Sequence, residues 1–164
     1  MLNWIGRQRQ RVQAMWRQEG INPDEITSIL PIAADEKHSS PPRLLIVDDD
    51  LFIGRLMSDA LGPYYDIEVA FNATEAGLTI ERRSPDLIIL DIMMPGQDGQ
   101  EIGNQLHHDA RTRQIPFIIV SGDRRIAQKA AAAGAAAYLA KPFDIDALVA
   151  LVARVLAEHQ PQTG

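Results

Sequence analysis

Residues Pro85 to Gly99 read PDLIILDIMMPGQDG. Four consecutive apolar residues, Leu87 to Leu90, follow Pro85-Asp86 and lead directly into Asp91. Such a run is typical of a fully buried parallel strand, with Asp91 at its carboxyl end. Open α/β sheets bind ligands at that edge. The loop that follows, Met93 to Gly99, contains proline and glycine and can hold its backbone close to whatever Asp91 binds.

Three other apolar runs also end in polar residues. The first is followed by Asp48-Asp49-Asp50, the second by Ser121 and the third by Lys141. If these strands lie parallel in one sheet, the acids, the hydroxyl and the ammonium converge at one edge. An acid after a strand often only caps the next helix, and we expect that role for Asp50.

The pattern of the whole chain supports this arrangement. We expect strands at 44–47, 67–70, 87–90, 116–120 and 136–140, and helices at 51–61, 72–83, 100–108, 124–133 and 144–158. Their alternation predicts an α/β fold with a doubly wound, five-stranded parallel sheet. The corresponding domain spans residues 43–158 and is followed by a tail, 159–164.

The amino-terminal residues differ in composition from the rest. Residues 1–32 predict a short helical extension, and 33–42 a polar linker. Trp4 and Trp16, both tryptophans of the protein, lie in the extension beside several arginines. This combination favours an interaction segment, and the same amphipathic pattern also fits contact with a membrane surface.

Composition narrows the function classes. The chain has 164 residues, a formal net charge of -6 and no cysteine. General nucleic-acid binding is therefore not expected, and disulfides and zinc-thiolate sites are excluded. The sequence contains neither an apolar run of membrane-spanning length nor the apolar core of a signal peptide, so we expect a cytoplasmic protein.

The converging residues predict a chemistry. Neighbouring carboxylates repel one another, and a hard divalent cation such as Mg²⁺ relieves that repulsion through oxygen ligands. Such a cation also neutralises phosphate oxygens. Lys141 and Ser121 can bind the remaining phosphoryl oxygens, so the residues favour phosphoryl transfer to Asp91.

Separate motifs in one order connect the chain to a family. VDDD contains Asp48 and Asp49, LDIMMPGQDG contains Asp91, VSG contains Ser121, and YLAKPF contains Tyr138 and Lys141. From about Arg43 to Glu158 the chain closely resembles the receiver domain of bacterial two-component response regulators, which has a flavodoxin-like fold.

This resemblance implies a role for each matched residue. Mg²⁺ or Mn²⁺ would be held by Asp49, Asp91 and the backbone carbonyl of Met93, with Asp48 acting partly through water. Lys141 would pair with Asp91 and then with its phosphoryl group, and the Lys141-Pro142 bond would be cis. Ser121 would move toward the phosphoryl group, and Tyr138 would turn inward.

The resemblance also implies partners. A histidine kinase or phosphotransfer protein would phosphorylate Asp91, and a downstream protein would bind the result. The chain would catalyse only its own phosphorylation and dephosphorylation. Since no DNA-binding output domain follows Glu158, we expect output through the receiver surface and the amino-terminal extension.

A homodimer is expected through the fourth helix, fifth strand and last helix, as is common in similar receivers. In the last helix we expect Ala153 and Leu151 to lie away from the core, while Ala130 to Ala133 give the fourth helix little polar cover. The interface candidates are Lys129, Ala147, Ala150, Leu151 and Arg154, together with Trp4 and Trp16.

Two alternatives remain open from the residues. Asp48-Asp49-Asp50 after an apolar strand also fits the opening motif of Mg²⁺-dependent haloacid-dehalogenase-like phosphatases. Leu51 and Phe52 follow it where those enzymes usually have other residues, and the Asp91 motif would be unexplained. The second alternative is a receiver-shaped binding module that no longer takes phosphate.

Overall fold

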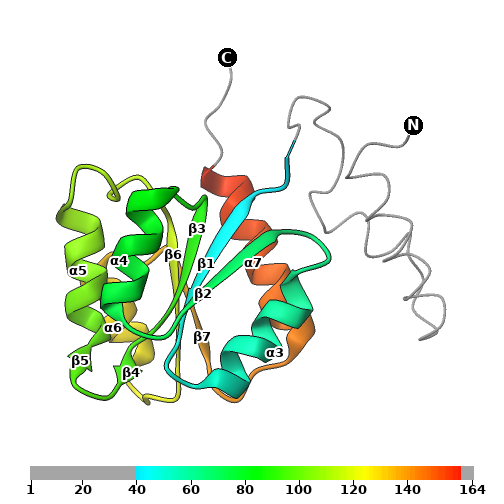
Figure 1. The fold of residues 1–164 in the computed structure, drawn as a ribbon. Helices are drawn as coiled ribbons and strands as arrows, with labels where there is room; N and C mark the ends of the chain where they lie inside the picture. Colours follow the sequence, from blue (N-terminus) through cyan, green and yellow to red (C-terminus); the bar gives the residue numbers. More distant parts are fainter. Residues whose placement is uncertain (1–39, 160–164) are drawn as a thin grey trace, which may run out of the picture.

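Five parallel strands form one sheet in the computed structural model, which describes residues 40–159 (Figure 1). Their order across the sheet is β2-β1-β3-β6-β7. The strands are β1 (Arg43–Val47), β2 (Asp66–Ala70), β3 (Leu87–Asp91), β6 (Phe117–Ser121) and β7 (Ala137–Ala140). The predicted doubly wound sheet is confirmed. The expected helical extension, 1–32, lies outside the described residues.

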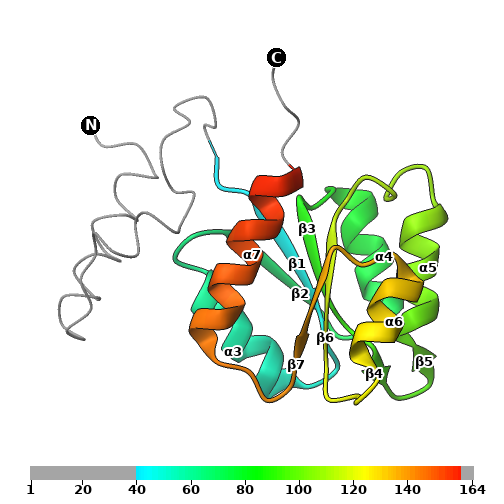
Figure 2. The ribbon, with the colours of Figure 1, turned by 180° about the vertical axis from the view of Figure 1, so that it is seen from behind.

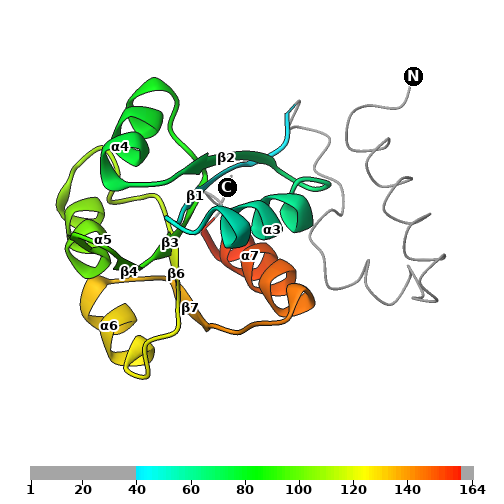
Figure 3. The same ribbon diagram turned by 60° about the horizontal axis from the view of Figure 1, so that its bottom comes forward.

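Helices cover both faces of the sheet (Figure 3). One face carries α3 (Leu51–Leu61) and α7 (Ile145–His159), and the other carries α4 (Ala73–Arg82), α5 (Gly99–His108) and α6 (Ile126–Ala133). Alternate residues of a strand point to opposite faces. In β1, Leu44 and Ile46 accordingly enter one core, and Leu45 and Val47 enter the other.

The central strand β3 positions the candidate site. It pairs with β1 on one side and β6 on the other, and all five of its residues, Asp91 included, are buried. Because the strands run parallel, the residues that follow β1, β3, β6 and β7 all reach the same edge of the sheet.

Side-chain caps begin two of the helices. The Asp50 carboxylate accepts hydrogen bonds from the backbone N–H groups of Phe52 and Ile53, at 2.9 and 3.1 Å, so its predicted capping role is confirmed. At α4, Asn72 accepts from the Glu75 N–H at 2.9 Å, and the Glu75 carboxylate accepts from the Phe71 N–H at 2.8 Å. In a capping box the second bond goes to the N–H of the cap residue itself, so this arrangement differs by one residue, since Glu75 bonds to Phe71.

Arg43 anchors the start of β1 at the opposite edge of the sheet. Its backbone N–H donates to Asp86 at 2.7 Å, and its guanidinium donates to the backbone carbonyl of Arg83 at 2.7 Å and to the Glu68 carboxylate at 3.0 Å. These bonds tie the first strand to β2 and to the segment that precedes β3.

One local feature after β3 was not predicted from the sequence. The loop after Asp91 contains a short antiparallel hairpin, β4 (Met93–Met94) with β5 (Gln97–Asp98). Strands of two residues are too short to produce a recognisable alternation of apolar and polar residues, so the sequence did not predict them. Gly96 between them has φ of 72°, a left-handed conformation that glycine adopts readily. In the described part of the chain, no helix has the length and apolar content required to span a membrane.

The last helix buries a wider stripe than predicted. Ala153 is buried, and Leu151 packs partly against the core, so the expectation that both lie away from it is wrong. The reason is that α7 contacts α3 as well as β7. Ala147 and Ala150 are exposed as expected. Of the four alanines from Ala130 to Ala133 in α6, the first and the last are also buried, and the two between them are exposed.

Candidate functional site

Asp91 ends β3 with its side chain 6% exposed, and both of its carboxylate oxygens accept hydrogen bonds. Oδ1 accepts a hydrogen bond from the backbone N–H of Met93 at 2.8 Å. Oδ2 accepts one from Lys141 Nζ at 3.0 Å. The Met93 side chain is itself exposed, so it is the backbone of Met93 that contacts Asp91.

Lys141 joins two strands of the site. Its ammonium lies 3.0 Å from Asp48 Oδ2 as well as 3.0 Å from Asp91 Oδ2. Its backbone N–H donates to the Ser121 carbonyl at 2.9 Å, which fixes the end of β7 beside the end of β6. The Lys141-Pro142 peptide bond is cis, as the resemblance implies.

Three carboxylates meet at this edge. Asp48 is fully buried, and its Oδ1 accepts from the Asp50 N–H at 2.9 Å. Asp49 is exposed, and its side chain makes no hydrogen bond or ion pair with the side chains that the structure describes, those of 40–96 and 101–159, or with their backbone. Asp48, Asp49 and Asp91 can each offer a carboxylate oxygen within 4.8 Å of the others. A group of oxygen donors at this spacing fits a hard divalent cation such as Mg²⁺.

Burial and charge oppose each other within the site. Burial raises the pKa of Asp48, although the Asp50 N–H and the Lys141 ammonium act against that rise. Burial lowers the pKa of Lys141, but the hydrogen bonds and charges of Asp48 and Asp91 outweigh burial and leave the pKa raised. When all these groups are ionised, one ammonium faces three carboxylates. The excess negative charge favours binding of a further cation.

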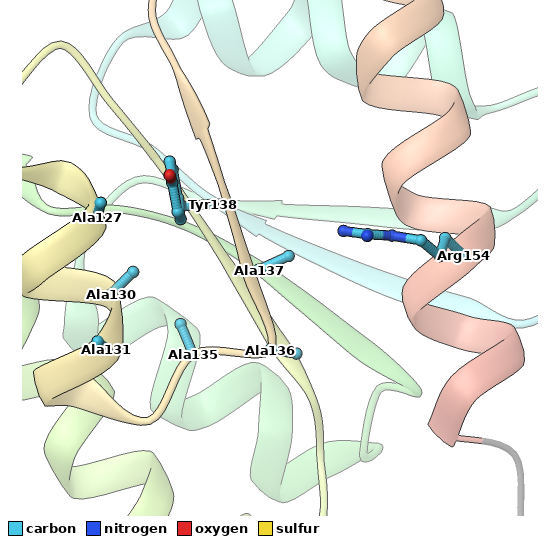
Figure 4. A pocket seen from close by; sticks show the side chains of 8 residues that line it. All are labelled: Ala127, Ala130, Ala131, Ala135, Ala136, Ala137, Tyr138 and Arg154. Carbon is cyan, nitrogen blue, oxygen red and sulfur yellow. The ribbon is translucent and has the colours of Figure 1, made fainter.

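The switch candidates Ser121 and Tyr138 lie on the two neighbouring strands β6 and β7. Ser121 is fully buried, and its Oγ accepts a hydrogen bond from the backbone N–H of Asp123 at 3.1 Å. Tyr138 is 47% exposed. Its side chain lies on the α6 side of β7 (Figure 4).

A hollow of about 540 Å³ adjoins Tyr138 between α6 and α7. Figure 4 shows small side chains lining its α6 side and Arg154 reaching toward β7 from α7. Its lining consists of Ala127, Ala130, Ala131, Ala135, Ala136, Ala137, Tyr138 and Arg154. Of the predicted interface residues, Arg154 therefore lies here, whereas Lys129 is engaged by Asp123.

The model of the response regulator receiver domain family matches residues 44–153, which include every acid, hydroxyl and lysine described above. The chain belongs to this family. Receiver domains are signalling modules of two-component systems, and the family assignment decides against the haloacid-dehalogenase-like alternative.

Similar proteins agree with the assignment of a receiver domain. The DNA-binding dual master transcriptional regulator RpaA of Synechocystis is 36% identical over 118 residues, which are 70% of this chain and 49% of that protein. Response regulator Rre1 of Synechocystis is 36% identical over 129 residues, 74% of this chain and 54% of the relative. This receiver chain thus spans about half the length of these curated relatives.

Solved structures give the same result for the receiver fold. A putative response regulator from Chloroflexus aurantiacus has a TM-score of 0.68 and 34% identity, covering 71% of this chain and 98% of the other. The chemotaxis response regulator CheY4 of Vibrio cholerae has a TM-score of 0.65 and 27% identity, covering 71% and 99%.

Two features of the receiver site were missed from sequence. The first is a group of exposed apolar side chains beside the acids: Leu51 is 67% exposed, Phe52 74% and Met93 58%. Leu51 and Phe52 directly follow Asp50, and Met93 lies two residues after Asp91; these positions outside the core stripes are the signal that reveals them. The second is the ion pair of Lys129 with Asp123 across the β6–α6 loop, which no helical spacing rule indicates.

Proposed function

We propose that this receiver domain works in the cytoplasm and accepts a phosphoryl group on Asp91 from a histidine kinase or phosphotransfer protein. The observation that carries the proposal is the contact of one Lys141 ammonium with both Asp48 and Asp91. This arrangement leaves a buried carboxylate at a ligand-binding edge with a cation already beside it.

The chain's residues hold the reacting carboxylate in place. The Met93 N–H and the Lys141 ammonium orient Asp91, and an Asp91 oxygen attacks phosphorus in line as the bond to the donor's histidine nitrogen breaks. Lys141 then neutralises part of the charge that the phosphoryl group adds. Asp48, Asp49, Asp91 and the Met93 carbonyl would hold Mg²⁺, which when bound neutralises phosphoryl oxygens.

The response of the domain involves Ser121 and Tyr138. In this proposal the Ser121 hydroxyl turns toward the phosphoryl group and donates a hydrogen bond to it. Tyr138 turns inward from its half-exposed position. The two residues together form a two-state element that changes the surface beside α6 and α7.

The exposed apolar group of Leu51, Phe52 and Met93 supports a protein as phosphoryl donor. Exposed apolar side chains gathered around a polar centre usually mark an interface. A helical donor that covers them would bring its phosphohistidine to the adjacent Asp91 and exclude water from the transfer.

The face of α6, β7 and α7 is the proposed site of homodimerisation or of a downstream protein. Figure 2 shows β7 between these two helices. The face combines the exposed alanines Ala147 and Ala150 of α7 with the alanine-lined hollow that Tyr138 and Arg154 border. Small side chains permit close approach of a second surface, and Arg154 supplies a charge that can orient it.

Intact-mass measurement after treatment with acetyl phosphate and Mg²⁺ tests the phosphorylation. Wild type is expected to gain one phosphoryl group, while Asp91→Asn and wild type in EDTA gain none. Asp86→Asn, at the opposite edge of the sheet, is the control and should be labelled like wild type. Labelling that persists in Asp91→Asn would overturn the proposal.

A further inference from the structure

One residue, Asp123, connects Ser121 to the start of α6. The Asp123 N–H donates to Ser121 Oγ at 3.1 Å, and its carbonyl accepts from the Ile126 N–H at 3.1 Å. Its carboxylate accepts from the Arg125 N–H at 2.7 Å and from Lys129 Nζ at 2.5 Å. The β6–α6 loop is therefore fixed at its strand end, at its turn and on the first turns of the helix.

The contact with Lys129 is the most protected ion pair of this loop. The side chains of Asp123 and Lys129 are 17% and 27% exposed. Arg125, the other cation near this carboxylate, lies 4.0 Å from it with its side chain 72% exposed. The hydrogen bond from Lys129 is also the largest cause of the lowered pKa of Asp123. Lys129 is thus the main charged partner of Asp123.

We propose that Lys129 is a positioning residue for the Ser121 switch, since its pair with Asp123 holds the loop in the state where Ser121 is bonded to the Asp123 N–H. The inference rests on the proposed function, in which the Ser121 hydroxyl must reach a phosphoryl group on Asp91. That movement changes the geometry of the bond from Asp123. A loop held by Lys129 resists the change, so the resting state is favoured.

The consequence is measurable as ligand affinity. A ligand that binds only one state of a protein binds more weakly when that state is less populated. Weakening the contact between Lys129 and Asp123 therefore increases the apparent affinity for a phosphoryl group. Simple electrostatics gives the opposite sign, because removing a cation near an acidic site disfavours binding of an anion.

The experiment measures the apparent Kd of the full chain for beryllium trifluoride with Mg²⁺, a non-covalent phosphoryl mimic. Lys129→Met is expected to bind about two- to five-fold more tightly than wild type, the range for a partly exposed ion pair. Lys129→Arg retains a cation for Asp123 and should restore the wild-type Kd. Arg124→Met is the matched control. Arg124 is an exposed cation of the same loop, and its side chain has no hydrogen bond or ion pair in the part of the chain that the structure describes.

Each outcome distinguishes the two proposals. Wild-type affinity or weaker binding in Lys129→Met overturns the role of Lys129 and leaves the proposed function intact. Equally tighter binding in Arg124→Met would show that the effect does not depend on the contact with Asp123, and it would also overturn the role of Lys129. If wild type binds no mimic at all, the proposed function fails, and the role of Lys129 fails with it.

Discussion

Lys141 and Asp91 are 50 residues apart in the sequence, and the lysine ammonium donates a hydrogen bond to the aspartate Oδ2 at 3.0 Å. The same ammonium makes an equal contact with Asp48. One cation thus balances two carboxylates that neighbouring strands bring together. Since Asp48 is fully buried, Lys141 has a structural role in addition to its proposed contact with the phosphoryl group.

Lys141→Met should therefore lower stability in a pH-dependent way. Without the cation, the free energy of unfolding near neutral pH is expected to fall by about 1–3 kcal/mol. Folding would then raise the carboxyl pKa of Asp48 further above its unfolded value, so the folded state binds protons more readily and the lost stability returns as pH falls. Urea unfolding without divalent cations, near pH 7 and near pH 4, measures this. Lys141→Arg is the charge-conserving control, and an equal loss at both pH values would contradict the explanation.

Ser121→Ala should separate phosphorylation from the response. The variant retains Asp91, Lys141 and the acidic group, so acetyl phosphate should still label it. Without the hydroxyl, Tyr138 is expected to stay in its exposed orientation. The NMR signal of fluorinated Tyr138 measures this, with Ser121→Thr as the control that keeps a hydroxyl. A Tyr138 shift as large in Ser121→Ala as in wild type would disprove the coupling.

The carboxyl group of Asp109, in the loop after α5, should titrate at unusually low pH. Arg111 holds the pKa of Asp109 at about 2, below its ordinary value of 3.8, first through its side-chain hydrogen bond and then through its backbone N–H. Because folding lowers this pKa, the stabilisation is complete above about pH 4 and is lost as pH falls through 2. Carboxyl NMR titration should give a pKa of about 2 for Asp109 in wild type and in Arg113→Met, the neighbouring control. In Arg111→Met the pKa of Asp109 should move toward 3.8. No movement there would exclude Arg111 as the cause.

Two adjacent substitutions in α7 test the proposed dimer face. Ala150 is exposed, so Ala150→Glu should weaken self-association while leaving the unfolding temperature close to that of wild type. Leu151 packs partly against the core, and Leu151→Glu should destabilise the fold by about 1–3 kcal/mol. Analytical ultracentrifugation and thermal unfolding of both variants give the comparison. Wild-type self-association and partner binding in Ala150→Glu would place the interface elsewhere.

The amino-terminal extension, residues 1–32, carries both tryptophans, so tryptophan fluorescence reports on the extension alone. If Trp4 and Trp16 dock on the receiver or on a partner, their emission should be blue-shifted relative to free tryptophan in water. Acrylamide quenching should be reduced to match. Trp4→Phe and Trp16→Phe assign the effect to one position. Emission and quenching like those of free tryptophan, both alone and in a complex, would count against an interaction segment.

The sequence predicted those features that repeat or that follow strands directly. Apolar runs such as Leu87–Leu90 determine the strands. When these strands lie parallel in one sheet, the residues that follow them, Asp48, Asp91, Ser121 and Lys141, come to one edge. Features that depend on how two elements pack could not be read in this way. Ala153 looks like an outer alanine until α7 is seen to contact α3.

The same limit applies at the site. Aspartate after a strand and lysine in a helix are each ordinary, so the pairing of Asp123 with Lys129 depends on the conformation of the β6–α6 loop. Helix beginnings were predicted well where a side chain caps them, as at Asp50 and Asn72. The prediction was two residues early at α6, where Arg125 makes no side-chain cap bond.

The anchoring of Arg43 has a practical consequence for observing this protein in action. The chain enters the sheet at a fixed point, and β1 then runs its five residues before Asp48 is reached. A fluorophore attached just ahead of Arg43 would therefore stand roughly 16 Å from the acidic edge, the length of such a strand. Figure 1 shows that the end of α7 emerges at the same end of the molecule. Probes at these two positions could follow the binding of a partner at the acidic edge without obstructing it.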